Sequence, residues 1–458
     1  MRASWGGVSR RSVLAGGAMA LASGLGACAS GPQKPARPVA AGLKDTELRR
    51  LIETVGGPVV AGERLNVGAL RDYYERHDFN PVWPQRQRQA EALVELVLRA
   101  EEHGLDPERF RAGLLRRRDE FPVLQRELLL TDALLAYGDA LAHGAVPPTR
   151  RKRLEALSPG RIEVGAALDA AIASHDPAAE FEALAPTTPT YRVLREALRE
   201  GVRLPPRQMS GARRAAALRS AMRRWQTIAV NLERQRWIPR QLPADRVWVN
   251  VPDQDLVLFR DDRRHFQTQV IVGDNAERNQ SPEFDTVIEA SFFNPPWVIP
   301  RDIVEAEILP RLAREPDYLA RNNMVMKPNG EIEQSAGPEA GLGFVLFDMP
   351  NRFDVYLHDT PDRFLFSRSN RRMSRGCIRV QQPRELAALL LDEPLEAINR
   401  KIEAGRTIRT TLPNPTPVYV TYQTAFADAE ERLQFRTDFY GRDEDLWRRL
   451  RGEGEAAA

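Results

Sequence analysis

The spacing of apolar residues changes near residue 240, and this change constrains the fold more than any other feature of the chain. From about Asp45 to Trp237, apolar side chains recur at every third or fourth position with few β-branched runs, which is typical of amphipathic helices. The clearest such segments are Gln89–Glu102, Leu124–His143, Tyr191–Glu200 and Ala212–Arg236. From Arg246 onward, apolar and polar residues alternate, as in half-buried strands. We therefore expect an α+β protein with a mainly helical region followed by a β-rich domain.

The alternating half contains a hairpin signal and several further strand signals. Val247–Val251 and Leu256–Phe259 flank the turn residues Pro252–Asp255, and Phe266–Val272 follows as a third strand. Later strands are expected at Thr286–Phe292, Phe344–Phe347, Arg352–His358 and Val418–Tyr422. Residues 303–340 interrupt this series with a helical pattern from Ile303 to Arg314 and little strand signal. They predict an insertion in the sheet-rich domain.

The N-terminus has the pattern of an export signal. Arg10 and Arg11 precede a short apolar run, Val13–Leu25, which is too short to cross a bilayer comfortably, and Cys28 follows it. The paired arginines resemble a twin-arginine signal, and Leu-Gly-Ala-Cys resembles a lipoprotein processing site that would make Cys28 the acylated first residue. The alternative for Cys28 is a small residue in the tail of an uncleaved apolar run. Under the first reading the protein is periplasmic and lipid-anchored, and Ala29 favours the outer membrane over the inner.

These patterns divide the chain into five segments. They are a signal peptide (1–27), a flexible proline-containing tether (28–44), a helical domain (45–240), a β-rich domain (241–425, with the insertion at 303–340) and a charged, partly helical C-terminal extension (426–458).

Charge and cysteine content exclude several classes of function. The net charge is +3, and residues 1–27 hold three arginines and no acid, so the remainder has 3 − 3 = 0 and no general electrostatic basis for binding nucleic acid. The two cysteines could form a disulfide in an oxidising compartment, but a lipidated Cys28 would leave Cys377 as a free thiol. No histidine or cysteine cluster has metal-ligand spacing and no phosphate-binding loop occurs, so we expect neither a metal nor a soluble cofactor.

The strongest chemical signal is the step from His358 to Ser374-Arg375-Gly376-Cys377-Ile378-Arg379. A thiol becomes a useful nucleophile when a base takes its proton and positive charge lies nearby, and this segment offers both. The strand expected before it would place Asp354, Tyr356 and His358 on one face. Gly376 would allow a tight turn whose free amides could stabilise an oxyanion. The pattern indicates cysteine acyl-transfer chemistry.

His-Asp-Thr-Pro, followed by Ser-x-Gly-Cys-x-Arg, resembles the catalytic signature of L,D-transpeptidases with the YkuD-type domain, which remodel peptidoglycan. The resemblance implies that Cys377 is the nucleophile and His358 the base, oriented by the backbone carbonyl of Asp359. It implies that Gly376 and Cys377 offer oxyanion amides, and that Arg379 holds a stem-peptide carboxylate or supports the loop. Tyr356 and Ser374 are further candidate substrate-binding residues. Many members have His at the position of Arg375, so no role is assigned to it.

Patches of the helical half resemble the scaffold domain of one subgroup of this family. These patches are Leu70–Trp83, His103–Pro107 and Asn231–Pro239. In this subgroup, residues 303–340 would form a lid over the substrate groove, whereas the alternative is an insertion without function. Many relatives also carry a small peptidoglycan-binding module. Here Tyr191–Leu204 leads almost directly into Ala212–Arg236, and the gap is far below the roughly 40 residues that a separate module needs.

The resemblance implies a peptidoglycan L,D-transpeptidase that cross-links stem peptides through a cysteine acyl-enzyme. The main alternative is an L,D-carboxypeptidase or endopeptidase-type hydrolase on the same fold, and a non-catalytic wall-binding lipoprotein is a third class. The expected partners are peptidoglycan stem peptides and a membrane through the lipid anchor, with other cell-wall synthesis proteins as candidates.

Overall fold

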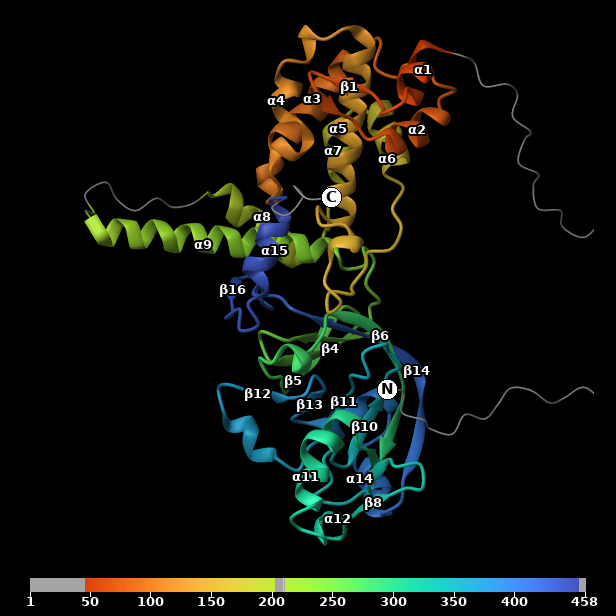
Figure 1. Cartoon of the computed structure of the whole chain (residues 1–458), viewed down its shortest axis with the longest axis vertical. Helices are drawn as coiled ribbons and strands as arrows, with labels where there is room; N and C mark the ends of the chain where they lie inside the picture. The colour runs from red at the N-terminus through yellow and green to blue at the C-terminus, as the bar shows by residue number, and fades with distance from the viewer. Residues whose placement is uncertain (1–45, 202–208, 210, 453–458) are drawn as a thin grey trace, which may run out of the picture. The chain divides into compact units, whose positions relative to one another are not determined.

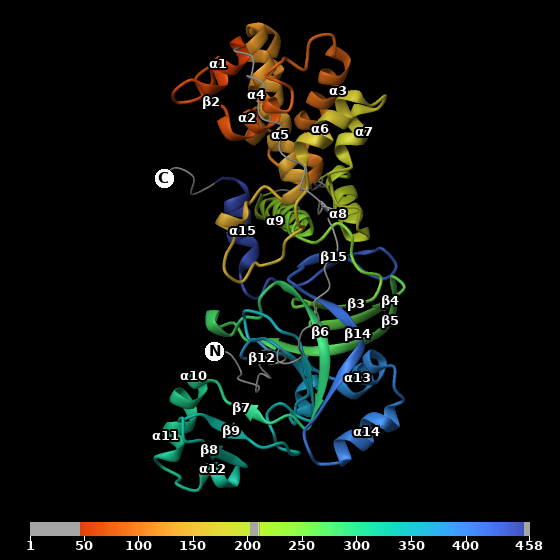
Figure 2. The same cartoon turned by 90° about the vertical axis from the view of Figure 1, so that its right-hand side faces the viewer.

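The computed structural model describes residues 46–201, 209 and 211–452, which fall into two compact units divided between Val82 and Trp83 (Figures 1 and 2). The predicted signal peptide (1–27), Cys28, the tether (28–44) and residues 453–458 of the predicted extension lie outside the described residues. Within the described part, no helix combines the length and hydropathy that a membrane crossing requires.

The smaller unit holds two helices joined through a short hairpin. Helix α1 (Glu47–Glu53) begins after Thr46, whose hydroxyl accepts a hydrogen bond from the Arg49 N–H, and α2 (Val67–Glu75) begins after Asn66 in the same way. Such side chains satisfy backbone N–H groups that have no partner at a helix start. Between the helices, β1 (Val59–Val60) pairs antiparallel with β2 (Glu63–Arg64). The buried apolar side chains of the helices are Leu48, Ile52, Leu70, Tyr73 and Tyr74.

The larger unit begins with a helical part. Its helices are α3 (Gln87–Leu98), α4 (Ala112–Arg116), α5 (Val123–His143), α6 (Val164–Ala173), α7 (Pro177–Glu182), α8 (Pro189–Arg199) and α9 (Gly211–Arg236). Short 3-10 turns lie at η1 (Ala100–His103), η2 (Pro107–Phe110), η3 (Arg118–Glu120) and η4 (Pro148–Arg150). Helix α5 is apolar around most of its circumference because it is buried along most of its length. The predicted helix Gln89–Glu102 instead ends at Leu98, and the chain then tightens into η1.

A nine-stranded sheet forms the frame of the β-rich half. Its strands are β3 (Arg246–Asn250), β4 (Asp255–Arg260), β5 (Arg263–Gly273), β6 (Phe284–Phe293), β10 (Val345–Asp348), β11 (Leu357–His358), β12 (Arg372–Ser374), β13 (Ile378–Val380) and β14 (Ile408–Thr421). Their order is β12-β5-β13-β11-β10-β6-β14-β3-β4, and a further β4–β5 pairing closes the sheet on itself. The α+β prediction, helical first and β-rich second, is confirmed.

The interior of this sheet is apolar and is covered by two helices. Valine, leucine and phenylalanine side chains from alternate strand positions make one cluster with helix α13 (Pro383–Leu391) and helix α14 (Leu395–Glu403). Leu386 and Leu390 of α13 are fully buried in it. Figure 2 shows both helices beside β14. Burial of such side chains contributes about 1.5–3 kcal/mol each, which makes the sheet a firm support for the loops at its edge.

Two strand predictions differ from the structure. The predicted strand Arg352–His358 is a strand only at Leu357–His358, because the Asn351 amide bonds the backbone of Val355 and Asp354 has a left-handed φ of +53°. Strand β14 begins ten residues before the predicted Val418. Pro413, Pro415 and Pro417 near its middle hide the alternation, and the register shifts between Thr411 and Thr416.

The insertion has a small core of its own. It holds α10 (Arg301–Ile303), the π-turn η6 (Val304–Ile308), α11 (Leu309–Leu312) and α12 (Tyr318–Arg321), with β7 (Trp297–Val298), β8 (Met324–Met326) and β9 (Ile332–Gln334). The three strands form a separate sheet in the order β7-β9-β8. The sequence shows little strand signal here because strands of two or three residues are too short to show alternation. Ile299, Ile303, Val304, Ile308 and Ile332 form the buried cluster.

The last described segment joins both parts of the larger unit. Strands β15 (Ala425–Ala427) and β16 (Leu433–Phe435) form a hairpin, and helix α15 (Arg442–Leu450) follows. Trp447 of α15 meets Trp225 of α9 edge to face at 5.3 Å between ring centroids. The remaining 3-10 turns are η5 (Glu277–Asn279) and η7 (Arg363–Ser367).

Candidate active site

The sheet brings His358 and Cys377 onto neighbouring strands. Strands β11 and β13 run parallel, with Leu357 opposite Ile378 and His358 opposite Arg379. Cys377 directly precedes β13, and the Ile378 N–H donates to the Tyr356 carbonyl over 2.9 Å. Because alternate residues of a strand share a face, Tyr356, His358, Cys377 and Arg379 lie on the same side of this pair. Strand pairing thus brings the His358 and Cys377 motifs together, although other residues separate them along the chain.

The Cys377 thiol lies against the backbone of the segment before β11. Its Sγ is 3.8 Å from the Asp354 carbonyl oxygen, and the Tyr356 N–H points at it. Burial raises the pKa of the Cys377 thiol, while the Tyr356 N–H and the Arg379 guanidinium act against that rise. Burial likewise raises the pKa of the half-buried Tyr356 hydroxyl. At neutral pH the thiol therefore rests protonated.

His358 is buried and its ring is held by backbone carbonyls. Nδ1 lies 2.6 Å from the Asp359 oxygen, to which an Nδ1–H would donate, and the Leu342 backbone also contacts the ring. Burial, together with the charge of Arg379, lowers the pKa of His358 to about 3. The imidazole is therefore neutral at neutral pH, and with Nδ1 protonated the other ring nitrogen keeps its lone pair. That is the form a general base needs.

Asp359 also anchors the strand end through its carboxylate. Oδ1 accepts hydrogen bonds from the Thr360 N–H and from Arg363, and Oδ2 accepts from the Phe344 N–H. Gly343 packs so closely that a Cβ there would lie 2.6 Å from the Asp359 side chain. These contacts fix the carbonyl on which His358 rests.

The Gly376 amide is not free, in contrast to the expectation from sequence. Gly376 has φ +111°, a conformation that favours glycine, and its N–H donates to the Ser374 hydroxyl over 3.2 Å. The same hydroxyl donates to the Cys377 carbonyl. Ser374 is thereby committed to shaping the loop, while among the described residues the Cys377 N–H donates to no group. Of these two amides, only the Cys377 N–H can donate to an oxyanion without rearrangement of the loop.

The Arg379 guanidinium makes only part of the hydrogen bonds that it could make. One terminal nitrogen donates to the Thr360 hydroxyl and to Asp362, whereas its buried Nε has no hydrogen-bond partner. A buried unpaired N–H costs about 1–3 kcal/mol, so an arriving carboxylate would gain by accepting from it.

Arg375 contacts the insertion. Its guanidinium forms an ion pair with Glu307 of η6, which joins the nucleophile loop to residues 297–340. No role could be assigned to Arg375 from the sequence, because its partner Glu307 belongs to a separate small fold.

The sequence reading missed three residues behind the nucleophile loop. They are Gly273 at the end of β5, Ser281 in the next loop and Tyr440 beyond the last hairpin, and they are hydrogen-bonded to one another and to Gly376. Their residue types are common and their chain separations from Cys377 are large. No sequence signal marks them.

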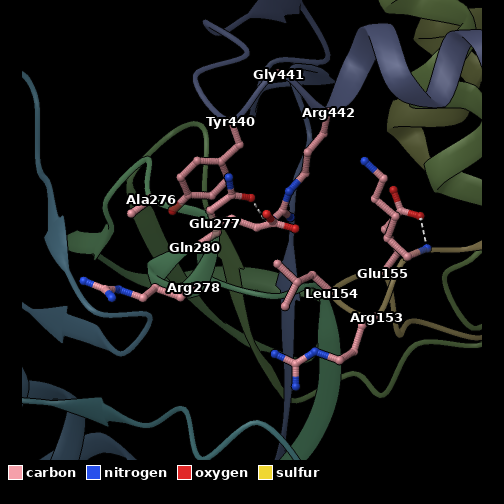
Figure 3. Close-up of a pocket in the computed structure, with 11 residues that line it drawn as sticks. Arg153, Leu154, Glu155, Ala276, Glu277, Arg278, Gln280, Tyr440, Gly441 and Arg442 are labelled. Atoms are coloured by element: carbon pink, nitrogen blue, oxygen red, sulfur yellow. Dashed lines mark hydrogen bonds between the residues drawn. The ribbon is translucent and has the colours of Figure 1, made fainter. Parts of the chain in front are cut away.

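Two cavities flank the site. One of about 1000 Å³ has Tyr440 and Arg442 on one side and Arg153 and Leu154 on another (Figure 3). Gln280, which also lines it, has its carbonyl oxygen next to Gly376. The other, of about 340 Å³, lies beside Asp359 and Thr360. Across the described part of the chain, no group of three or more His, Cys, Asp or Glu side chains is placed to hold a metal ion.

Comparisons with known proteins match two parts of the chain. Residues 244–420 match the family model of the L,D-transpeptidase catalytic domain, and residues 68–198 match that of the scaffold domain. A Haemophilus influenzae protein named "Putative L,D-transpeptidase" is 30% identical over 244 residues, which cover 48% of this chain and 49% of that protein. The chain thus spans about half the length of this curated relative.

Solved structures give weak overall matches. The carbamoyl enzyme of Ldtfm with avibactam is 12% identical with a TM-score of 0.20, covering 40% of this chain and 50% of that one. An L,D-transpeptidase from Mycobacterium smegmatis is 12% identical with a TM-score of 0.22, covering 39% and 58%. Behind a segment that matches the scaffold domain, the chain thus carries a segment that matches the YkuD-type L,D-transpeptidase catalytic domain.

Proposed function

We propose that this protein is a peptidoglycan L,D-transpeptidase that joins stem peptides through an acyl-enzyme on Cys377. The observation that carries the proposal is the placement of Cys377, His358 and Arg379 on one face of the β11–β13 pair, within the part of the chain that matches the catalytic-domain model. One nucleophile, one neutral base and one cation with a free N–H are the groups that acyl transfer from a carboxylate-bearing peptide requires.

The first half of the reaction forms a thioester. His358 takes the thiol proton as the Cys377 sulfur attacks the carbonyl carbon of the third stem residue. The carbonyl oxygen becomes an oxyanion that the Cys377 N–H can stabilise. Collapse of this intermediate breaks the C–N bond, and the His358 proton passes to the leaving amine of D-Ala. Arg379 holds a carboxylate of the donor peptide.

The second half uses an amine of a neighbouring stem. The amine attacks the thioester, His358 takes one of its protons, and the C–S bond breaks as that proton returns to sulfur. Water in place of the amine would give the hydrolase reaction with the same residues, so the acceptor alone separates the two functions.

Incubation with tetrapeptide muropeptides separates these outcomes. The mature enzyme should release D-Ala and yield dimers joined between two third-position residues, as measured by mass spectrometry. Cys377→Ala should yield neither product, and His358→Ala should slow acylation by a carbapenem because the thiol loses its base. Accumulation of tripeptide monomers alone, with amine acceptor abundant, would replace the transferase with the hydrolase. Acylation of the Cys377→Ala protein would remove the nucleophile assignment.

The lipid anchor belongs to the same proposal and rests on the sequence around Cys28. Each buried methylene contributes about 0.8 kcal/mol to membrane affinity, so a multiply acylated Cys28 should hold the enzyme in the membrane fraction at any salt concentration. Fractionation of wild type and Cys28→Ala measures this. A wild-type protein that is soluble in the periplasm with Cys28 unmodified would contradict it.

A further inference from the structure

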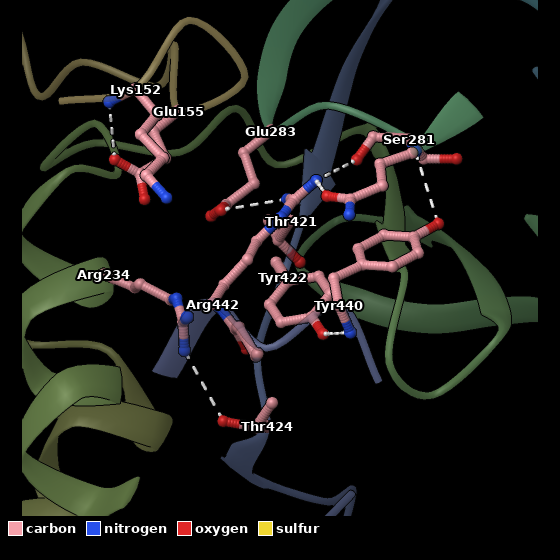
Figure 4. A network of polar contacts seen from close by, with 12 residues as sticks. Lys152, Glu155, Arg234, Ser281, Glu283, Thr421, Tyr422, Thr424, Tyr440 and Arg442 are labelled. Carbon is pink, nitrogen blue, oxygen red and sulfur yellow. Dashed lines mark hydrogen bonds and ion pairs between the residues drawn. The ribbon is translucent and has the colours of Figure 1, made fainter. Parts of the chain in front are cut away.

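We propose that Ser281 and Tyr440 are positioning residues that aim the Cys377 N–H at the oxyanion formed during acyl transfer. The inference takes the type of reaction from the proposed function. Its structural basis is a set of hydrogen bonds on the far side of the nucleophile loop, outside the sequence motif (Figure 4).

The first step is the peptide bond between Gly376 and Cys377. The Ser281 hydroxyl donates to the Gly376 carbonyl oxygen over 2.8 Å, at a fully buried position. Because a trans peptide is planar, its C=O and the following N–H point in opposite directions. Holding the Gly376 oxygen against Ser281 therefore turns the Cys377 N–H away from Ser281. Glycine at 376 has a soft backbone, so the direction needs an external support.

The second step is that, of the two loop amides, only the Cys377 N–H is available to bind an oxyanion. The neighbouring Gly376 N–H is taken by Ser374, whose hydroxyl also holds the carbonyl of Cys377. Two serines thus fix the carbonyls before and after the Cys377 N–H, which itself donates to nothing among the described residues. An oxyanion donor that is oriented beforehand costs no reorganisation during the reaction.

The third step is the support of Ser281 itself. Its hydroxyl accepts from the Gly273 N–H over 3.0 Å, and its own N–H donates to the Tyr440 hydroxyl over 3.3 Å. Tyr440 in turn donates to the Gly273 carbonyl over 2.6 Å, so its hydroxyl bridges the two chain segments. A Cβ at Gly273 would lie 1.9 Å from the Asn279 oxygen, which shows how closely these segments approach.

The fourth step is the support of Tyr440. Its ring stacks on Tyr422 at 5.3 Å between centroids with planes 17° apart, and the Arg442 guanidinium lies 4.8 Å from its centroid. Arg442 also donates to the Ser281 carbonyl over 2.9 Å. Figure 4 shows Tyr440 and Arg442 reaching Ser281 from the C-terminal segment. The ring is held by packing, so Tyr440→Phe removes the hydroxyl and leaves the rest in place.

Two small reagents test the inference without knowledge of the natural substrate. Attack of the Cys377 thiolate on p-nitrophenyl acetate passes through an oxyanion before p-nitrophenolate leaves and an acetyl thioester remains. Attack on iodoacetamide displaces iodide in one step without an oxyanion. The ratio of the two rates at Cys377, assigned by peptide mapping, therefore reports oxyanion stabilisation independently of the thiolate fraction.

Tyr440→Phe and Ser281→Ala should each lower this ratio about tenfold, and the double variant should lose little more than one single variant because both act through one amide. Tyr419→Phe is the matched control, since Tyr419 packs on Trp248 of β3 and has no contact with the loop. Thermal unfolding checks each variant, and if Ser281→Ala fails to fold, Tyr440→Phe decides alone.

An unchanged ratio in Tyr440→Phe, or equal losses with both reagents, would overturn the inference, because the hydroxyl would then only support the fold. The two proposals can fail separately. A lowered ratio in a protein that makes no muropeptide dimers would remove the transpeptidase function and keep the positioning role, whereas dimers with an unchanged ratio would do the reverse.

Discussion

Burial moves the pKa values of Cys377 and His358 in opposite directions, up for the thiol and down to about 3 for the imidazole. Both groups are therefore neutral at rest, and in the proposed reaction the proton moves when the substrate carbonyl is attacked. Arg379 lowers both pKa values, which assists the thiolate but opposes the imidazolium. A resting neutral pair protects the Cys377 thiol from adventitious oxidation, because the thiolate is the reactive form.

The pH dependence of alkylation should show this resting state. The rate of Cys377 modification by iodoacetamide should still rise with pH above 9, because the raised pKa keeps the thiol protonated there. Arg379→Gln should move the midpoint higher still, and Arg379→Lys, which retains the charge, should leave it closer to wild type. Rates followed by mass spectrometry from pH 6 to 11 measure this. A plateau below pH 8 would indicate a preformed thiolate and contradict the assignment.

The sequence marks the reacting residues but not those that hold them. Cys377 and His358 stand out because rare residue types occur at a characteristic spacing. Ser281 and Tyr440 act through hydrogen bonds that join chain positions 95 and 159 residues apart, and serine and tyrosine are common. The Gly376 amide was expected to be free, since nothing in the sequence shows that the Ser374 hydroxyl turns back onto it.

Regular elements were predicted where one pattern governs the whole element. The hairpin β3–β4 and helix α5 follow their patterns closely, because packing on a single interior decides each position. Strand β11 was overestimated because the Asn351 side chain takes over backbone hydrogen bonds that a strand would make. The short strands of the insertion were missed because three residues are too few to show an alternation of apolar and polar side chains.

In the lid role that the resemblance implies for residues 303–340, the ion pair between Arg375 and Glu307 should influence closure. Both side chains are partly exposed, so the pair is worth at most about 1 kcal/mol, and Arg375→Glu should raise the ratio of hydrolysis to transfer about threefold. Glu307→Arg should do the same, while the double exchange should restore the wild-type ratio. Muropeptide products measured by mass spectrometry give the ratio.

Arg301→Glu is the control for this pair, because it breaks the Arg301–Glu305 pair within the insertion without touching the nucleophile loop. If the double exchange behaved like either single change, the ion pair would have no part in closing the site.

At the scale of the larger unit, buried charges join segments that are far apart in the chain. Glu283, at the start of β6, pairs its backbone with Leu154 and Ala156 and its side chain with Arg442 (Figure 4). Arg449 of α15 forms two hydrogen bonds with Glu155, at 2.7 and 2.8 Å. The same C-terminal segment that carries Tyr440 thus also binds the scaffold part. Through Arg442, which donates to the Ser281 carbonyl, the junction also contacts the residue behind the nucleophile loop.

This junction should make the stability of the protein depend on pH. Burial raises the pKa of Glu283 to about 7 in spite of Arg234 and Arg442, whereas the unfolded chain has an ordinary carboxyl near 4.5. Between about pH 4.5 and 7 the folded state then binds the proton that the unfolded state has lost, so the contribution of Glu283 to stability falls as pH rises. The shift corresponds to about 3 kcal/mol.

Urea unfolding of wild type and Glu283→Gln at pH 5 and pH 8 tests this. The variant should gain free energy of unfolding relative to wild type on going to the higher pH, because the amide cannot ionise in the buried site. Glu289→Gln, an exposed change on the same strand, is the control. If the free energy of unfolding of the wild type instead rose with pH relative to that of Glu283→Gln, the ion pair with Arg442 would outweigh burial. The junction would then be held by charge pairing across the two parts of the unit.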